Sequence, residues 1–186
     1  MKKLMLILVA VALLVALPTA VLADKPDKGL KGLKGQAGKS NVAFVELWEK
    51  DANWGIVEDG AWGKLKYNLE GPEFDFVFNG HGLALNTTYS LIYYADPWPG
   101  DNPGFLIASG TSNDEGNIHL MGPVEMGMDL PDPADANYPD GNYPDGAKIW
   151  LVLSDDYDAD ECKMIGWNPT EYLFEYDVIT YDDTDV

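Results

Sequence analysis

Residues 61–69 read Ala-Trp-Gly-Lys-Leu-Lys-Tyr-Asn-Leu, a stretch in which Ala, Gly, Leu, Tyr and Leu alternate with Trp, Lys, Lys and Asn. Successive side chains of a strand point to opposite faces of a sheet, so this alternation predicts a strand with one face toward a core. Similar stretches, rich in aromatic and β-branched residues, recur along the chain. The further strands that we predict are 42–48, 74–78, 89–93, 104–109, 116–121, 149–153 and 172–178.

Short turns separate the predicted strands. Asp-Gly or Asn-Gly pairs occur at 59–60, 79–80, 140–141 and 145–146, and such frequent turns between short strands are typical of sandwiches and barrels. We predict an all-β fold, a two-layer antiparallel β-sandwich of about eight strands with Greek-key connections, Ig-like in the broad sense.

Two connections between the strands have a distinct character. Residues 109–117 are predicted to form the tip of a hairpin that joins 104–109 to 117–121. Residues 122–147 form the longest connection and contain the sequence Asn-Tyr-Pro-Asp-Gly twice in succession. We interpret this segment as a surface loop of successive tight turns.

The first 23 residues have the features of a secretory signal peptide. A positive Met-Lys-Lys start precedes the apolar run Leu4–Leu17, and Val-Leu-Ala precedes Asp24. A membrane anchor is the alternative, but the run is shorter than the roughly 20 residues that span a bilayer. We therefore predict a signal peptide over 1–23, a flexible Lys- and Gly-rich linker over 24–40 and a domain over 41–186 that is secreted without a transmembrane anchor.

The chain is strongly acidic, with 31 Asp and Glu residues against 12 lysines, no arginine and a net charge of −19. This charge repels phosphate polymers, and no guanidinium is present to grip a phosphate or a guanine edge, so nucleic-acid binding is excluded. The predicted domain carries 29 acidic residues and 5 lysines, a balance that attracts cations. One cysteine excludes an internal disulfide and a Cys₄ metal site.

The densest acidic segment follows the predicted strand 149–153 and contains the pattern Asp-x-Asp-x-Asp, whose alternate carboxylates suit Ca²⁺. An EF-hand is excluded, because Glu161 stands where that loop needs Gly and Trp167 stands where it needs a bidentate Glu. We expect a looser calcium site on a β-loop, the alternative being a solvated acidic loop. The candidate metal ligands are Asp155, Asp156, Asp158, Asp160 and Glu161.

Soft side chains suggest copper as a further alternative. They are His119, Met121, Met126, Met128, Cys162 and Met164. Copper binds thioether, thiolate and imidazole groups, and blue-copper sites occur on β-sandwiches. The chain has no histidine after Cys162, however, where such a site requires one. The competing interpretation places Met121 in the core and Met126 and Met128 in a loop.

Signals for catalysis are weak. His81 lies in a glycine-flanked turn, and no nucleophile elbow, zinc-protease, phosphate-loop or dinucleotide motif occurs. Carboxylate pairs such as Glu58 and Asp59 are unavoidable in so acidic a chain. We expect a protein without catalytic activity, with a small extracytoplasmic hydrolase or metal-dependent enzyme as the alternative.

Tryptophans in turns are the clearest candidates for ligand binding. Trp98 lies between two prolines and follows Asp96, Trp167 precedes Asn-Pro, and Trp54 follows Asn53 in another turn. Flat rings beside polar groups can stack on sugar faces while their neighbours bind hydroxyls. We expect Trp98, Trp167 and Asp96 to contact a glycan, unless these rings fold back over the core.

Two stretches resemble a known group of proteins. Residues 60–67, Gly-Ala-Trp-Gly-Lys-Leu-Lys-Tyr, and 166–177, Gly-Trp-Asn-Pro-Thr-Glu-Tyr-Leu-Phe-Glu-Tyr-Asp, resemble uncharacterised secreted β-sandwich proteins of archaea and bacteria, and the similarity spans 42–183. The resemblance implies an extracytoplasmic domain and no assigned activity. Together with the aromatic turns it leads us to expect a secreted binding module for cell-surface or extracellular glycan, stabilised by Ca²⁺.

Overall fold

The computed structural model describes residues 40–94, 104–133 and 145–186, and its main feature is one antiparallel sheet of eight strands. The hydrogen-bonded order of the strands is β6-β5-β8-β11-β1-β2-β4-β7. Their bounds are β1 Ala43–Trp48, β2 Trp62–Tyr67, β4 Phe76–His81, β5 Thr88–Tyr94, β6 Phe105–Thr111, β7 Ile118–Met121, β8 Lys148–Leu153 and β11 Leu173–Glu175.

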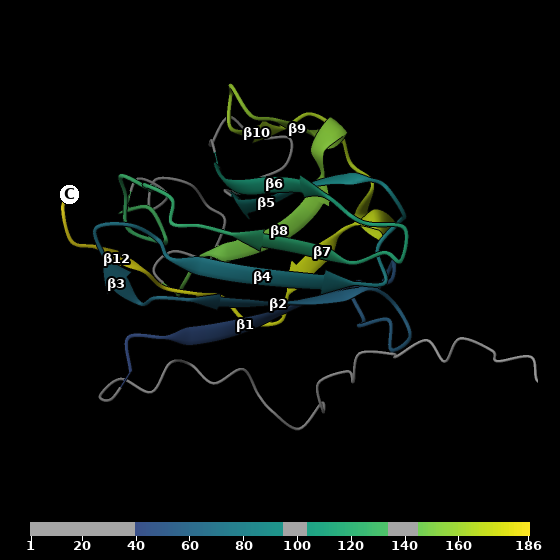
Figure 1. The fold of residues 1–186 in the computed structure, drawn as a ribbon, viewed down its shortest axis with the longest axis horizontal. Coiled ribbons are helices and arrows are strands. Elements are labelled where there is room, and N and C mark those ends of the chain that lie inside the picture. The colour runs from purple at the N-terminus through teal and green to yellow at the C-terminus, as the bar shows by residue number, and fades with distance from the viewer. Residues whose placement is uncertain (1–39, 95–103, 134–144) are drawn as a thin grey trace, which may run out of the picture.

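The sheet curls until it is nearly closed into a barrel (Figure 1). Its two edge strands approach each other, as the contact of Gly110 of β6 with the Leu120 side chain of β7 shows. A register shift between Leu91 and Ile92 of β5 marks a bulge, and bulges of this kind increase the bend of a sheet.

The eight strands of the sheet correspond to the eight predicted stretches, and the prediction of an antiparallel all-β fold is confirmed. The two-layer sandwich and its Ig-like arrangement are not confirmed, because all eight strands belong to one hydrogen-bonded sheet. The predicted hairpin of 104–121 is corrected as well: β6 and β7 follow each other in the chain but form the two edges of the sheet. Their connecting turn packs on the β4–β5 connection, where the Ser112 hydroxyl donates to the Ala84 carbonyl at 2.5 Å.

The inward side chains fill the barrel with one apolar core. Leu65, Phe78 and Leu91 are fully buried there, and the Phe78 ring lies against Gly63 of the neighbouring strand. A side chain at residue 63 would occupy the space of this ring, which explains the glycine in an otherwise regular strand. Met126 lies in the connection after β7, as predicted, and its side chain packs into this core. Met121 points outward and is 66% exposed, so its predicted place in the core was wrong.

A second apolar cluster covers part of the outer face. The segment 154–172 contains the 3₁₀ turns η2 (Ser154–Asp156) and η3 (Pro169–Glu171) and the short strands β9 (Tyr157–Asp158) and β10 (Lys163–Met164). Figure 1 shows β9 and β10 as a small ribbon outside the barrel. The members of the cluster are Ile92, Tyr94, Trp150, Val152, Tyr157, Met164, Tyr172 and Phe174. Because this cluster lies outside β5 and β8, both of those strands are buried on their two faces.

One end of the barrel carries the C-terminal residues. There β12 (Asp182–Asp183) pairs in parallel with β3 (Glu70–Gly71), next to the C-terminus in Figure 1. Residues 1–39 lie outside the described part, so the predicted signal peptide and nearly all of the predicted linker are not placed. Within the described ranges, no helix has the length and apolar character needed to cross a membrane.

Candidate functional site

An aromatic row crosses the outer face of five neighbouring strands. Cross-strand pairing places five aromatic side chains next to one another. They are Trp150 on β8, Phe174 on β11, Trp48 on β1, Trp62 on β2 and His81 on β4. Neighbouring rings interact: the ring centres are 4.9 Å apart for Trp150 and Phe174, and 4.8 Å apart for Trp62 and His81. Cross-strand aromatic pairs of this kind stabilise a sheet, and most of the row is buried under other residues.

Trp54 lies over this row and is exposed. Its loop joins β1 to β2 and is fixed by Asp51, whose Oδ1 accepts hydrogen bonds from the N–H groups of Asn53 and Gly55 at 2.8 and 2.9 Å. Trp54 has a φ angle of 64°, a conformation that bulky side chains rarely adopt. The ring meets Phe174 edge to face at 5.0 Å, yet 56% of the residue remains exposed.

Trp167 reaches the same place from the segment outside the barrel. Its ring centre is 5.8 Å from that of Trp150 and 6.4 Å from that of Phe174, and 37% of the residue is exposed. Below it, Tyr94 stacks on Trp150 with ring centres 3.7 Å apart. We call Trp54, Trp167, Trp150, Phe174 and Tyr94 the aromatic shelf. Its two exposed rings both rest on Phe174, so they belong to one surface.

Two lysines and a glutamate border the aromatic shelf. The Lys50 Nζ lies 5.6 Å from the centre of the Trp54 ring and donates a hydrogen bond to the Glu175 carbonyl at 3.2 Å. Burial lowers the pKa of Lys50, and the charge of Glu175 partly restores it. The Lys148 Nζ lies 6.0 Å from the centre of the Tyr94 ring. These two residues are two of the five lysines in the domain, so positive charge gathers beside the shelf.

The carboxyl group of Glu175 is strongly affected by this environment. Burial raises the pKa of its carboxyl group to about 7, against smaller lowering effects of its own backbone N–H and of Lys50, Lys148 and Trp150. The Glu175 Oε2 and the Trp150 Nε1 are both buried. They face each other, because the Trp150 side chain is a hydrogen-bonding contact of the Glu175 carboxyl group.

The predicted ligand-binding residues have different outcomes. Trp167 belongs to the aromatic shelf, whereas Trp98 and Asp96 lie outside the described residues. Sequence reasoning noted Trp54 in a turn but did not select it as a ligand-binding residue, and it missed Lys50 and Glu175. The pattern Asp51-x-Asn53-Trp54-Gly55 was the available signal, because an Asp that bonds the backbone two residues later fixes such a turn.

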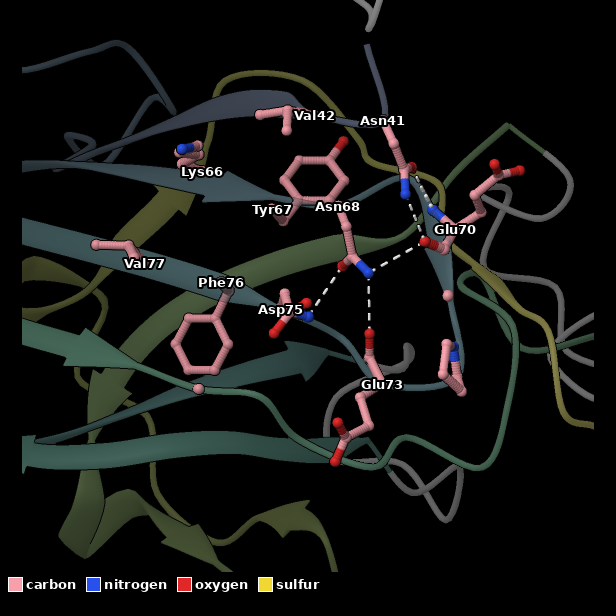
Figure 2. A pocket seen from close by; sticks show the side chains of 13 residues that line it. Asn41, Val42, Lys66, Tyr67, Asn68, Glu70, Glu73, Asp75, Phe76 and Val77 are labelled. Carbon is pink, nitrogen blue, oxygen red and sulfur yellow. Dashed lines mark hydrogen bonds between the residues drawn. The ribbon is translucent and has the colours of Figure 1, made fainter.

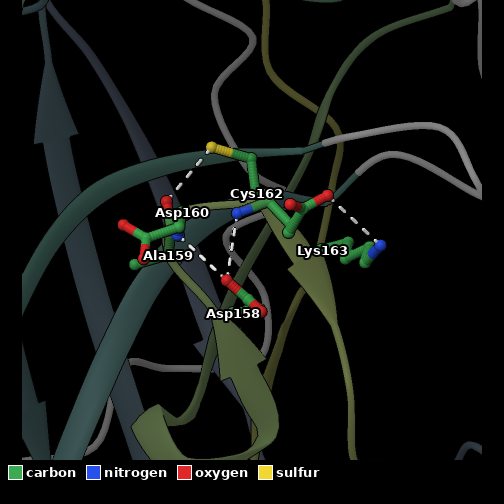
Figure 3. A network of polar contacts seen from close by, with 6 residues as sticks. Asp158, Ala159, Asp160, Cys162 and Lys163 are labelled. Atoms are coloured by element: carbon green, nitrogen blue, oxygen red, sulfur yellow. Dashed lines mark hydrogen bonds and ion pairs between the residues drawn. The ribbon is translucent and has the colours of Figure 1, made fainter.

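The predicted calcium ligands point to different partners (Figure 3). Asp156 is buried and accepts hydrogen bonds from the Tyr172 hydroxyl at 2.5 Å and the Asn168 amide at 2.7 Å. Asp158 instead accepts from the backbone N–H groups of Asp160 and Glu161, at 3.0 Å each. Glu161 pairs with Lys163 at 3.5 Å, and Asp155 and Asp160 are exposed. Across the described ranges, no three His, Cys, Asp or Glu side chains are gathered as a metal site.

The residues considered for copper lie in four places. His119 and Met121 point outward from β7, Met126 lies in the barrel core and Met164 in the outer cluster. Cys162 lies in the turn between β9 and β10, where its thiol donates to the Ala159 carbonyl (Figure 3). The His119 Nδ1 is 2.8 Å from the Asn79 Oδ1, and His81 makes the same contact with Asn117.

A pocket of about 630 Å³ has Asn41 and Val42, the two residues before β1, in its lining (Figure 2). It therefore lies at the opposite end of β1 from the Trp54 loop. The Asn68 amide bonds to the backbone of Glu70, Glu73 and Asp75, so it shapes the pocket wall. The two aromatic residues in the lining, Tyr67 and Phe76, are buried. The pocket therefore offers acidic groups but no exposed ring face.

Comparisons with protein-family models, curated proteins and solved structures found no match to this chain. The resemblance to secreted β-sandwich proteins thus stays a prediction. Within the described residues, the aromatic shelf is a surface on which two exposed tryptophan rings lie together, with Lys50 beside one of them.

Proposed function

We propose that this protein is a secreted, non-catalytic carbohydrate-binding module and that the aromatic shelf is its binding surface. The observation that carries the proposal is the exposed ring of Trp54, held at a φ of 64° by a loop fixed through Asp51. Such a backbone conformation costs of order 1–3 kcal/mol and is found chiefly where function requires it. A tryptophan that only covered the core would not need to stand 56% exposed in this conformation.

The chemistry of the shelf suits a sugar. The exposed faces of Trp54 and Trp167 offer apolar area for the C–H face of a pyranose ring. The Lys50 ammonium group lies beside the Trp54 ring, so a hydrogen-bond donor is available for hydroxyl groups. A preformed platform of this kind binds with little loss of side-chain freedom.

The charge of the domain favours a neutral glycan. With 29 acidic residues against 5 lysines, the domain repels sulfated and uronic-acid polymers over a Debye length of about 8 Å at physiological salt. We therefore propose neutral polysaccharide of the cell surface or extracellular matrix as the partner.

The test is affinity electrophoresis of the full chain in gels that contain hydroxyethylcellulose, xylan, glucomannan or laminarin, with dextran sulfate as the anionic probe. We expect retention by at least one neutral polymer and none by dextran sulfate. Trp54→Gly should weaken retention at least about tenfold, equivalent to about 1.4 kcal/mol. Because Gly accepts a positive φ, this variant should remain folded.

Phe44→Ala is the matched control. Phe44 is an exposed aromatic residue of β1, but it lies at the other end of that strand from the shelf, so retention should not change. The proposal is wrong if no neutral polymer retains the protein, or if Trp54→Gly is retained like the wild type.

A further inference from the structure

The C-terminal strand contains a buried carboxylate without a partner. Asp183 of β12 is 3% exposed, and both of its side-chain oxygens are buried and accept no hydrogen bond. Its backbone is fixed, because its N–H donates to the Asp129 Oδ1 at 2.9 Å and β12 pairs with β3. A buried carboxylate is strongly unfavourable unless a donor or a cation neutralises it.

A second carboxylate lies against Asp183. The exposed Asp185 side chain is within hydrogen-bonding reach of the Asp183 carboxyl group. Two ionised carboxylates are both acceptors, so neither can satisfy the other. One cation between them would satisfy both.

Other acidic groups surround this pair. Asp129 is fixed beside Asp183 through one of its two oxygens, and the charge of Glu125 acts on Asp185. Asp183, Asp185, Asp75 and Glu125 all lie close enough to Tyr181 for their charges to act on its hydroxyl group. This end of the barrel therefore concentrates negative charge around the buried Asp183 carboxylate.

We propose that Asp183 and Asp185, with Asp129 beside them, bind a calcium ion that fastens the C-terminal strand to the end of the barrel. The ligands are all hard oxygens, and Ca²⁺ takes six to eight of them in flexible geometry, including waters and backbone carbonyls. Since no three acidic side chains are already gathered in the described ranges, the site is partly hydrated, with a Kd of about 10⁻⁴–10⁻³ M, as in weak extracellular sites. It is separate from the segment 155–161 in which the sequence predicts calcium.

Thermal unfolding of the full chain with the metal alone tests the proposal. We expect about 10 mM CaCl₂ to raise Tm by roughly 5 °C relative to NaCl of equal ionic strength, and MgCl₂ to raise it less. Asp183→Asn keeps the shape of the side chain and removes its charge, so the calcium-dependent rise should disappear. Asp185→Asn alters an exposed residue and serves as a second variant if the first does not fold.

Asp182→Asn is the matched control, because Asp182 lies on the same strand and is exposed; this variant should keep the full calcium response. The proposal is overturned if CaCl₂ leaves the wild-type Tm unchanged, or if the Asp183 and Asp185 variants still respond. It is equally overturned if Asp158→Asn alone abolishes the response, which would locate the ion in 155–161. Glycan retention of Asp183→Asn should be normal, since Trp54 lies at the other end of β1, so the two proposals fail independently.

Discussion

The conformation of Trp54 connects local backbone chemistry to the proposed function. The Asp51 carboxylate holds the loop through two backbone N–H groups, and the fixed loop keeps a bulky residue at positive φ with its ring exposed. The sequence indicated a turn here, because Asp, Asn and Gly surround the tryptophan. It did not indicate where the ring would lie, since the contact with Phe174 joins residues 120 positions apart in the chain.

Glu175 gives a prediction for pH dependence. Its pKa in the folded protein is raised to about 7 from an ordinary value of 4.5, so between these pH values the folded state binds a proton that the unfolded state has lost. Stability should therefore fall as pH rises from about 4.5 to 7, by on the order of 3 kcal/mol from this group. Glu175→Gln should remove that part of the fall, measured by urea unfolding at pH 5 and pH 8.

The comparison for this prediction is Glu73→Gln, which removes an exposed carboxylate and the same amount of charge. The two variants should differ in the pH dependence of the free energy of unfolding. Equal slopes for both variants and the wild type would show that the Glu175 carboxyl group is not held in a desolvated environment.

Strands β8 and β11 show which elements can be predicted from alternation and which cannot. The apolar run Ile149–Leu153 predicted a strand, and β8 is buried on both faces because the segment 154–172 folds over it. The pattern of 172–178 predicted seven residues of strand, but β11 has only three. The preceding η3 turn and the bond from the Tyr172 hydroxyl to Asp156 fix Tyr172 before the strand begins.

Strands β2 and β4 provide a packing prediction. Gly63→Ala should destabilise the protein by about 1–3 kcal/mol, because the added methyl group would overlap the Phe78 ring in a filled core. Urea unfolding measures the change. In the background of Phe78→Leu, which removes the ring, the same substitution should cost clearly less. Equal costs in the two backgrounds would contradict the packing described for this pair.

The arrangement of the complete domain was only partly predictable. Alternating side chains report which face of each strand is buried, and this information located all eight strands of the sheet. It does not report which strands are neighbours, so a nearly closed single sheet and a two-layer sandwich have the same pattern. The aromatic shelf and the proposed Asp183 site both depend on such long-range pairing, which explains why the sequence indicated neither of them.

The six tryptophans of the chain offer a direct test of the central claim that the aromatic shelf binds neutral glycan. Each indole N–H gives its own signal in a ¹H–¹⁵N spectrum, which can be followed while a neutral hexasaccharide of the retaining polymer is added. We expect the signals of Trp54 and Trp167 to move and saturate together. The signal of Trp48, a buried residue of β1, should move little. If neither the Trp54 nor the Trp167 signal moves while the sugar is bound, the aromatic shelf is not the binding surface.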